Sequence, residues 1–373
     1  MLETPLYDTH LSLGAKISSF GGWLMPIQYQ GILAEHAHTR HSVSVFDVCH
    51  MGELLLEVNS RLSGFDRIVT PDIISMSVAS CRYGFMLNEE GGILDDLVIY
   101  RLAKNNWMLV VNAATTSADF EYLKRNLSGE YRLQNMSEKT GKLDVQGPQS
   151  QDVLKDIFGE DITKLDYYTF ADFVFEKECC IISRTGYTGE LGFEIYISND
   201  YVLALWETLL KDSRVRPAGL GSRDTLRLEM GYPLYGQDLD AWHTPLDAGF
   251  GKFVDFSKTF IGKDALLNER KKGILKHLVC FQSDYRRAPR HGFAIFDKDQ
   301  RVGTVTSGSF SPSLCVGIGM GYVAGSYDIG NQLLVKDASA EIPVKIVKRP
   351  FLNRTSLLKK ESFNEHTKKP IIH

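Results

Sequence analysis

Two adjacent aspartates, Asp95 and Asp96, interrupt an apolar run in the stretch NEEGGILDDLVIY, residues 88–100. Asp is depleted in strands, and an ionised carboxylate is costly to bury. In an extended strand the two side chains would point to opposite faces, and both faces are apolar here. The first interpretation is that one Asp closes the turn after Gly92 and the other lies exposed at a sheet edge. The second is a carboxylate in an apolar pocket, where it stabilises an iminium or ammonium cation or transfers a proton.

A second candidate cluster is SRTGYTGELGFEIY, residues 183–196, in which glycines permit a tight turn. Alternation after the turn places Glu194 and Tyr196 on one face. A carboxylate at Glu194 could accept two parallel N–H bonds from a flat heterocycle, with Tyr187 supplying an aromatic face. The alternative is a plain hairpin turn with a solvated Glu.

A third cluster, GLGSRDTLRLEMGYPLYGQDLD, places Arg223 and Arg227 four residues apart on one face of a predicted helix. Asp224 and Glu229 are nearby structural partners. One arginine is therefore expected in an internal salt bridge, which leaves the other for a ligand.

Three further patterns do not support a site. His36, His38 and His41 in HAHTRH lack an acidic or Cys ligand to complete a metal set, and a solvated helix face is favoured. No helix pattern follows the glycines of VGIGMGYV, so a dinucleotide-binding loop is not indicated. The sequence also has no Gly-x-Ser-x-Gly elbow and no phosphate loop.

The elements that would position these residues are short strands and helices. Apolar runs separated by turn residues predict an antiparallel meander over 83–87, 93–101 and 107–112, followed by a helix over 114–126. The next predicted elements are a hairpin over 179–185 and 192–198, and helices over 200–211 and 219–231. The polar run 268–276 is the best candidate boundary, because short strands and turns typical of a small β domain follow it.

Composition excludes several classes of protein. The length of 373 residues predicts two or three ordinary domains. The chain is 43% hydrophobic and 24% charged with a net charge of -4, so no nucleic-acid partner is expected. The first residues do not resemble a targeting segment, and no apolar run is long enough for a membrane span, so a cytoplasmic protein with no membrane association is expected. The six cysteines lack metal or disulfide spacing and are predicted to be reduced core thiols.

Nine segments taken in order closely resemble the T-proteins of the glycine cleavage system, which are tetrahydrofolate-dependent aminomethyltransferases. The resemblance runs from about residue 4 to about residue 354, and it is carried by FGGWLMPIQY, FDVCHMGE, GGILDDLVIY, VNAAT, VQGPQS, SRTGYTGELGFE, PAGLGSRDTLRLEMGYPLYGQDLD, FIGKDAL and VTSGSFSPSL.

The resemblance implies an α+β fold, a cloverleaf of three domains around a central folate cavity. The domains it implies are a discontinuous folate-binding domain of residues 1–53 and 141–267, an inserted ferredoxin-like domain of residues 54–140, and a small β-barrel or jelly-roll domain of residues 275–358. The resemblance does not cover residues 359–373, whose charged and mostly polar sequence predicts a flexible tail.

The resemblance also implies the reaction. The family takes an aminomethyl group from the lipoyl arm of its partner, the H-protein, and transfers the one-carbon unit to tetrahydrofolate. Ammonia and 5,10-methylenetetrahydrofolate are the products, and other glycine cleavage components are indirect partners. The essential aspartate of the family falls on Asp96. No metal is implied.

The remaining site residues follow from the matched motifs. Tyr187, Glu194 and Arg223 would hold the pterin, with Glu194 pairing with its amide-like edge, and the cavity wall would include Met51, Tyr83, Tyr100, Val110, Asn112 and, with a less defined role, Tyr235. The chain departs from the family at Cys49, where Ser is common, near Val316, where a lysine is often found, and at KRPFLN, where Lys-Pro-Phe-Tyr is usual. These departures concern contacts to the folate tail.

Two other activities use the same fold. Folate-binding scaffolds of iron–sulfur cluster assembly carry a Lys-Gly-Cys-Tyr-x-Gly-Gln-Glu motif, but this chain reads MGYPLYGQD at that place. Folate-dependent demethylases take a methyl group from a small donor without a lipoyl partner. The intact GGILDDL and SRTGYTGE favour the aminomethyltransferase, and a purely structural protein, which would not bind folate, is the remaining alternative.

Overall fold

The structure is a computed structural model that describes residues 1–338 and 341–357. The predicted tail, 359–373, lies outside the described residues. The chain forms two units, each discontinuous in sequence. The first contains Met1–His50, Ser137–Met230 and the described residues from Leu352 onward, and the second contains Met51–Met136 and Gly231–Phe351. The boundaries of the three expected domains stay a prediction.

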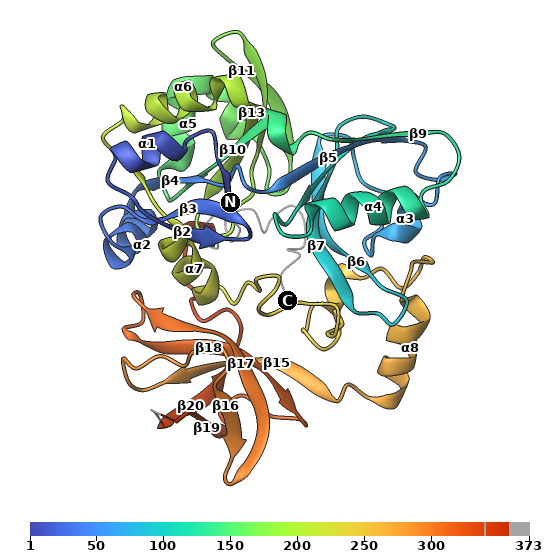
Figure 1. Cartoon of the computed structure of the whole chain (residues 1–373), viewed down its shortest axis with the longest axis vertical. Helices are drawn as coiled ribbons and strands as arrows, with labels where there is room; N and C mark the ends of the chain where they lie inside the picture. The colour runs from blue at the N-terminus through green and yellow to red at the C-terminus, as the bar shows by residue number, and fades with distance from the viewer. Residues whose placement is uncertain (339–340, 358–373) are drawn as a thin grey trace. The chain divides into compact units, whose positions relative to one another are not determined.

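The first unit is built on a six-stranded sheet (Figure 1). In sheet order its strands are β11 (Phe170–Phe175), β12 (Glu178–Ser183), β13 (Gly192–Ser198), β10 (Thr140–Gln146), β4 (Val43–Asp47) and β14 (Val215–Pro217). The predicted hairpin is the antiparallel pair β12 and β13, in which Ser183 lies opposite Glu194.

Helices pack on one face of this sheet. Phe193 and Ile195 of β13 share a core with Leu205 and Trp206 of α6 (Asn199–Leu210) and Val153 of α5 (Ser150–Phe158). The other face therefore carries the alternate residues of the strands. The predicted helices 200–211 and 219–231 correspond to α6 and to α7 (Leu220–Glu229).

The N-terminal part of the first unit adds a small sheet and two helices. The strands are β1 (Leu2–Glu3), β3 (Trp23–Gln28) and β2 (Lys16–Phe20), and the helices are α1 (Tyr7–Ser12) and α2 (Ile32–His41). Gly219, just before α7, approaches the backbone of β3 so closely that a Cβ atom there would lie 2.3 Å from the Ile27 carbonyl carbon. This close approach requires glycine.

The second unit begins with a five-stranded sheet, β6 (Ser80–Leu87), β7 (Ile93–Arg101), β8 (Asn106–Val111), β5 (Gly52–Val58) and β9 (Tyr131–Asn135). The predicted meander is confirmed as β6, β7 and β8. Its helices are α3 (Phe65–Ile68) and α4 (Thr116–Asn126), and Phe65 and Leu123 share a core with Leu97, Ile99 and Leu109. One face of this sheet is thus packed by helices, as in the first unit.

The late part of the second unit is a closed barrel. Its strands are β15 (Lys276–Ser283), β18 (Val316–Ala324), β17 (Gln300–Ser311), β16 (Ala294–Asp297), β19 (Gln332–Lys336) and β20 (Glu341–Val347). VGIGMGYV is part of β18, and a Cβ atom at Gly319 would lie 2.6 Å from the Phe281 ring. These glycines thus serve barrel packing. The α+β prediction with a small β-barrel is confirmed.

The polar run 268–276 contains the end of α8 (Lys263–Lys272) and the start of β15 at Lys276, and its role as a domain boundary stays a prediction. One expectation needs correction. All six cysteines are free, but Cys179 and Cys315 are exposed. Alternation along β12 explains the exposure of Cys179, since its neighbour Cys180 points into the core. No helix within the described residues is long and apolar enough to cross a membrane.

Helix α6 offers a direct test of the first core. Leu205 is 0% exposed, whereas Leu203 of the same helix is 40% exposed. We expect Leu205→Ala to lower the free energy of unfolding by about 2–5 kcal/mol, because it leaves a cavity in the core. The matched variant Leu203→Ala should change it by less than about 1 kcal/mol. Urea unfolding followed by circular dichroism measures both, and equal losses would contradict the assigned orientation of α6.

Candidate functional site

The two aspartates lie in the middle of a central strand. In β7, Asp96 is opposite Phe85 and Asp95 is opposite Met86, and β7 has β6 and β8 as neighbours on its two sides. Neither aspartate closes a turn or lies at a sheet edge, so the first interpretation is wrong. Asp95 is on the face packed by α4, together with Leu97 and Ile99, and Asp96 is on the other face.

Hydrogen-bond donors hold the Asp96 carboxylate on both sides. The Tyr83 hydroxyl donates to Oδ2 over 2.9 Å, and Asn112 Nδ2 donates to Oδ1 over 2.9 Å. The Tyr83 ring packs edge-on against Phe253 with 4.9 Å between centroids. The carboxylate thus has a fixed orientation among aromatic side chains.

Burial sets the acidity of this group. The Asp96 residue keeps some exposure, but its carboxyl group is surrounded by protein. Burial and then the charge of Asp95 raise the pKa of Asp96 to about 7, against the donors Tyr83 and Asn112, which lower it. A carboxyl group with this pKa can act as an ion or exchange a proton near neutral pH.

Most of the wall residues implied by the family lie around Asp96 in the second unit. Val98 and Tyr100 of β7 are on the same face as Asp96. Tyr83 of β6 and Val110 of β8 both lie opposite Val98, so their side chains are on that face too. Met51 and Asn112 flank the paired ends of β5 and β8. The Tyr235 hydroxyl lies 3.5 Å from the Ile93 carbonyl oxygen at the start of β7.

Glu194 is the centre of the corresponding face in the first unit. It lies opposite Asp144 of β10, and its Oε1 is 3.4 Å from Nζ of the buried Lys142. Its Oε2 accepts from the Thr185 hydroxyl at 2.9 Å and the Tyr196 hydroxyl at 3.0 Å. Burial opposes ionisation, but Lys142 and then Arg223 outweigh it, so the pKa of Glu194 is lowered. The interpretation of Glu194 as a solvated side chain is therefore wrong.

Arg223 joins this group from α7. It forms an ion pair with Asp144, and its guanidinium lies 4.9 Å from the centre of the Tyr187 ring. Burial raises the pKa of Asp144 to about 6, although Arg223 acts in the opposite direction. The three residues expected to hold the pterin, Tyr187, Glu194 and Arg223, are thus brought together within one unit.

Comparisons with known proteins identify the family of this chain. The family model described as GCVT N-terminal domain matches residues 6–258, and the one described as glycine cleavage T-protein C-terminal barrel domain matches residues 276–353. The chain belongs to the glycine cleavage T-protein family. It is an aminomethyltransferase of that family.

Individual relatives of this T-protein family are similar over nearly the whole chain. A protein of Pseudothermotoga lettingae named aminomethyltransferase is 42% identical over 94% of this chain and 98% of its own. One of Caldanaerobacter subterraneus subsp. tengcongensis with the same name is 40% identical over 94% of this chain and 96% of its own. The crystal structure of the glycine cleavage system aminomethyltransferase T from Bartonella henselae has a TM-score of 0.89 and 35% identity, covering 95% of this chain and 98% of its own.

Sequence reasoning missed residues that lie beside Glu194 and Arg223. Lys142 and Asp144 were not identified, because their alternation in β10 acquires meaning only beside Glu194. Arg227 is paired with Asp224, as expected of one arginine, at 2.8 Å. Arg223 is also ion-paired, with an acid distant in sequence, and this partner was not foreseen.

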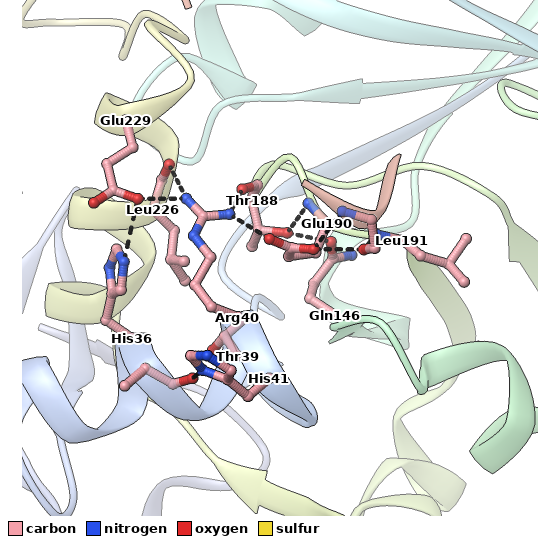
Figure 2. A network of polar contacts seen from close by, with 12 residues as sticks. His36, Thr39, Arg40, His41, Gln146, Thr188, Glu190, Leu191, Leu226 and Glu229 are labelled. Carbon is pink, nitrogen blue, oxygen red and sulfur yellow. Dashed lines mark hydrogen bonds and ion pairs between the residues drawn. The ribbon is translucent and has the colours of Figure 1, made fainter. Parts of the chain in front are cut away.

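A buried network holds the turn that carries Tyr187 (Figure 2). Arg40 of α2 donates to the Thr188 carbonyl at 2.7 Å and to Glu190 at 2.9 Å, and it also pairs with Glu229 of α7 at 2.7 Å. The Ser356 hydroxyl donates to Glu190 over 2.5 Å. Arg40 thus connects the turn to the helix that bears Arg223.

The histidines next to Arg40 differ from expectation. His36 is buried, with Nε2 3.2 Å from Glu229 and Nδ1 2.8 Å from the Thr225 hydroxyl, so it is not on a solvated face. Packing of α2 against α7 covers it. His38 bonds the Arg214 carbonyl, and His41 is exposed. Within the described ranges no group of three or more His, Cys, Asp or Glu side chains could hold a metal ion.

Arg40 should be important for stability, because one guanidinium balances two buried glutamates. We expect Arg40→Met to lower the free energy of unfolding by about 3 kcal/mol or more, since it leaves buried charges without their partner. Arg216→Met, at an exposed position, is the matched control and should cost less than about 0.5 kcal/mol. Denaturant unfolding measures both, and a neutral Arg40→Met variant would refute this role.

Proposed function

We propose that this chain transfers the one-carbon unit of an aminomethyl group, carried on the lipoyl arm of an H-protein, to tetrahydrofolate. The products are ammonia, 5,10-methylenetetrahydrofolate and the dihydrolipoyl arm. Other glycine cleavage components are indirect partners, and the reaction takes place in the cytoplasm. The relatives' printed names and the Asp96 geometry support this proposal.

The observation that carries the proposal is the fixed, enclosed carboxylate of Asp96. In this transfer positive charge develops on the reacting carbon and nitrogen. A preorganised carboxylate in a low-dielectric environment stabilises such charge far more than water does. Tyr83 and Asn112 hold Asp96 before substrate arrives, so the reaction needs no reorganisation of this group. Because the pKa of Asp96 is about 7, the same group can also take up a proton from folate and return it.

Glu194, Arg223 and Tyr187 are suited to a pterin. Glu194 is ionised and its two oxygens have further lone pairs for the N–H groups of a flat heterocycle. Tyr187 and the guanidinium of Arg223 add an aromatic face and a planar cation. Tyr83, Tyr100, Val110 and Met51 would supply apolar and aromatic wall, Asn112 a polar group, and Tyr235 a further contact.

The test is a single-turnover assay with aminomethylated lipoyl H-protein, with and without tetrahydrofolate. Folate-dependent release of ammonia and formation of methylenetetrahydrofolate are expected. Tight folate binding without turnover would favour the scaffold role of this fold, and turnover of a small methylated amine without H-protein would favour a demethylase. Absence of folate binding would refute the proposal.

Asp96→Asn should reduce the single-turnover rate by about 10²–10³-fold or more, because the amide keeps the packing and loses the charge. Circular dichroism should show an unchanged fold. Asp255→Asn, which removes a carboxylate bonded to the Ser257 amide, is the control and should keep its rate. A fully active Asp96→Asn enzyme would refute the assignment.

Glu194→Gln should act on folate affinity. Loss of one charge-assisted hydrogen bond is worth about 1.5–3 kcal/mol, so the Kd for tetrahydrofolate should rise by about tenfold or more. Glu207→Gln, at an exposed position of α6, is the control. Titration calorimetry measures both, alongside an unfolding curve because Lys142 loses its partner. An unchanged Kd in a folded Glu194→Gln protein would exclude a pterin contact.

A further inference from the structure

A second pair of carboxyl groups lies behind Asp96, on the helix-packed face of the same sheet. Asp95 is 0% exposed and Asp119 of α4 is 2% exposed. Their side chains are within hydrogen-bond reach of each other. Oδ2 of Asp119 is buried without a hydrogen-bond partner among the described residues. The reaction as described above uses neither carboxyl group.

Asn112 connects this pair to Asp96. Its Nδ2 donates to Asp95 Oδ1 at 2.8 Å and to Asp96 Oδ1 at 2.9 Å, and its backbone N–H donates to Asp95 Oδ2 at 3.0 Å. A flipped amide would place its oxygen against the same two carboxyl oxygens and would lose both hydrogen bonds that Nδ2 donates. Asp95 therefore fixes the orientation in which Asn112 donates to Asp96.

The pair has no cation to balance it. Within the described part of the chain, no Lys, Arg or His forms an ion pair with Asp95, Asp96 or Asp119. The groups that act on these three carboxyl groups, besides one another, are Tyr83 of β6, Asn112 and Thr115 before α4. Burial and then the three carboxyl groups in turn raise the pKa of Tyr235, as Asp240 does. Two buried carboxylates in direct contact cannot both ionise without a counter-charge, so they retain a proton.

We propose that Asp95 and Asp119 share one proton, and that this pair acts through Asn112 as the positioning group that sets the orientation and charge of Asp96. In the native protein the pair carries a single negative charge spread over two carboxyl groups. Burial raises the pKa of both members, that of Asp119 to about 6. The inference rests on the proposed function, in which Asp96 is the carboxylate at the reacting atoms.

Two isosteric variants separate this role from a purely structural one. In Asp119→Asn the new amide donates to Asp95, so the whole negative charge stays on Asp95, beside Asp96. In Asp95→Asn the new amide donates to Asp119, so the charge lies one carboxyl group further from Asp96. The first change opposes ionisation of Asp96 and the second assists it.

The experiment is the pH profile of the single-turnover rate from pH 5.5 to 9. The rising limb reports ionisation of Asp96, so we expect it to move to higher pH in Asp119→Asn and to lower pH in Asp95→Asn, each by about one pH unit. The maximal rate should fall more in Asp95→Asn, because Asn112 loses an acceptor. The matched control is Asp72→Asn, because the Asp72 carboxylate only caps a turn in the same unit. This variant should leave the rising limb of the pH profile in place. The proposal is overturned if the rising limb of the pH profile does not move in these two variants, or if it moves in the same direction in both.

A second measurement does not depend on turnover. Carboxyl ¹³C chemical shifts of aspartate-labelled native protein should show Asp95 and Asp119 titrating together, with one proton retained above pH 5. Independent titration of both near pH 4 would overturn the shared proton, even where a variant fails to fold. A native enzyme without turnover but with the coupled titration would instead place the failure in the proposed function.

Discussion

A buried carboxylate must find a counter-charge or hydrogen-bond donors, and the two units meet this requirement differently. In the first unit, Lys142, Arg223 and Arg40 are cations placed beside Glu194, Asp144, Glu190 and Glu229. In the second unit, Asp96 and Asp95 have Tyr83 and Asn112 as neutral donors. The result is a Glu194 that stays ionised and an Asp96 whose pKa is about 7. A carboxylate that stays ionised suits ligand binding, and a carboxyl group with a pKa near neutrality suits a reacting centre.

In both sheets the site carboxyl groups lie on the face that is not packed by helices. Helices cover the other face, so the alternate residues of each strand point to the uncovered face. Glu194 follows the core residue Phe193, and Asp96 precedes the core residue Leu97. The apolar residues of these strands thus fix the direction of the polar ones. A register shift of one residue would exchange the two sets.

The strand and helix periods were sufficient to predict most elements near the site, including β7, the β12–β13 hairpin and α7. Alternation also predicted that Asp95 and Asp96 point apart, but it could not choose between them, because both faces of β7 are apolar. The choice of Asp96 came from the family resemblance. Partners distant in sequence, such as Asp144 for Arg223 and Glu229 for His36, could not be predicted, because local patterns carry no information on which strand becomes a neighbour.

The Ser356 contact has a consequence for the order in which the protein can fold during its synthesis. The first unit takes its strands from both sides of the inserted residues, and Glu190 receives its last donor only from Ser356, near the end of the described chain. The five-stranded sheet of the second unit, by contrast, is complete once Asn135 has been made. The Asp96 strand can therefore form before the sheet of the first unit is complete, and the Ser356 contact to Glu190 is added to the turn of Tyr187 only after both sheets have been synthesised.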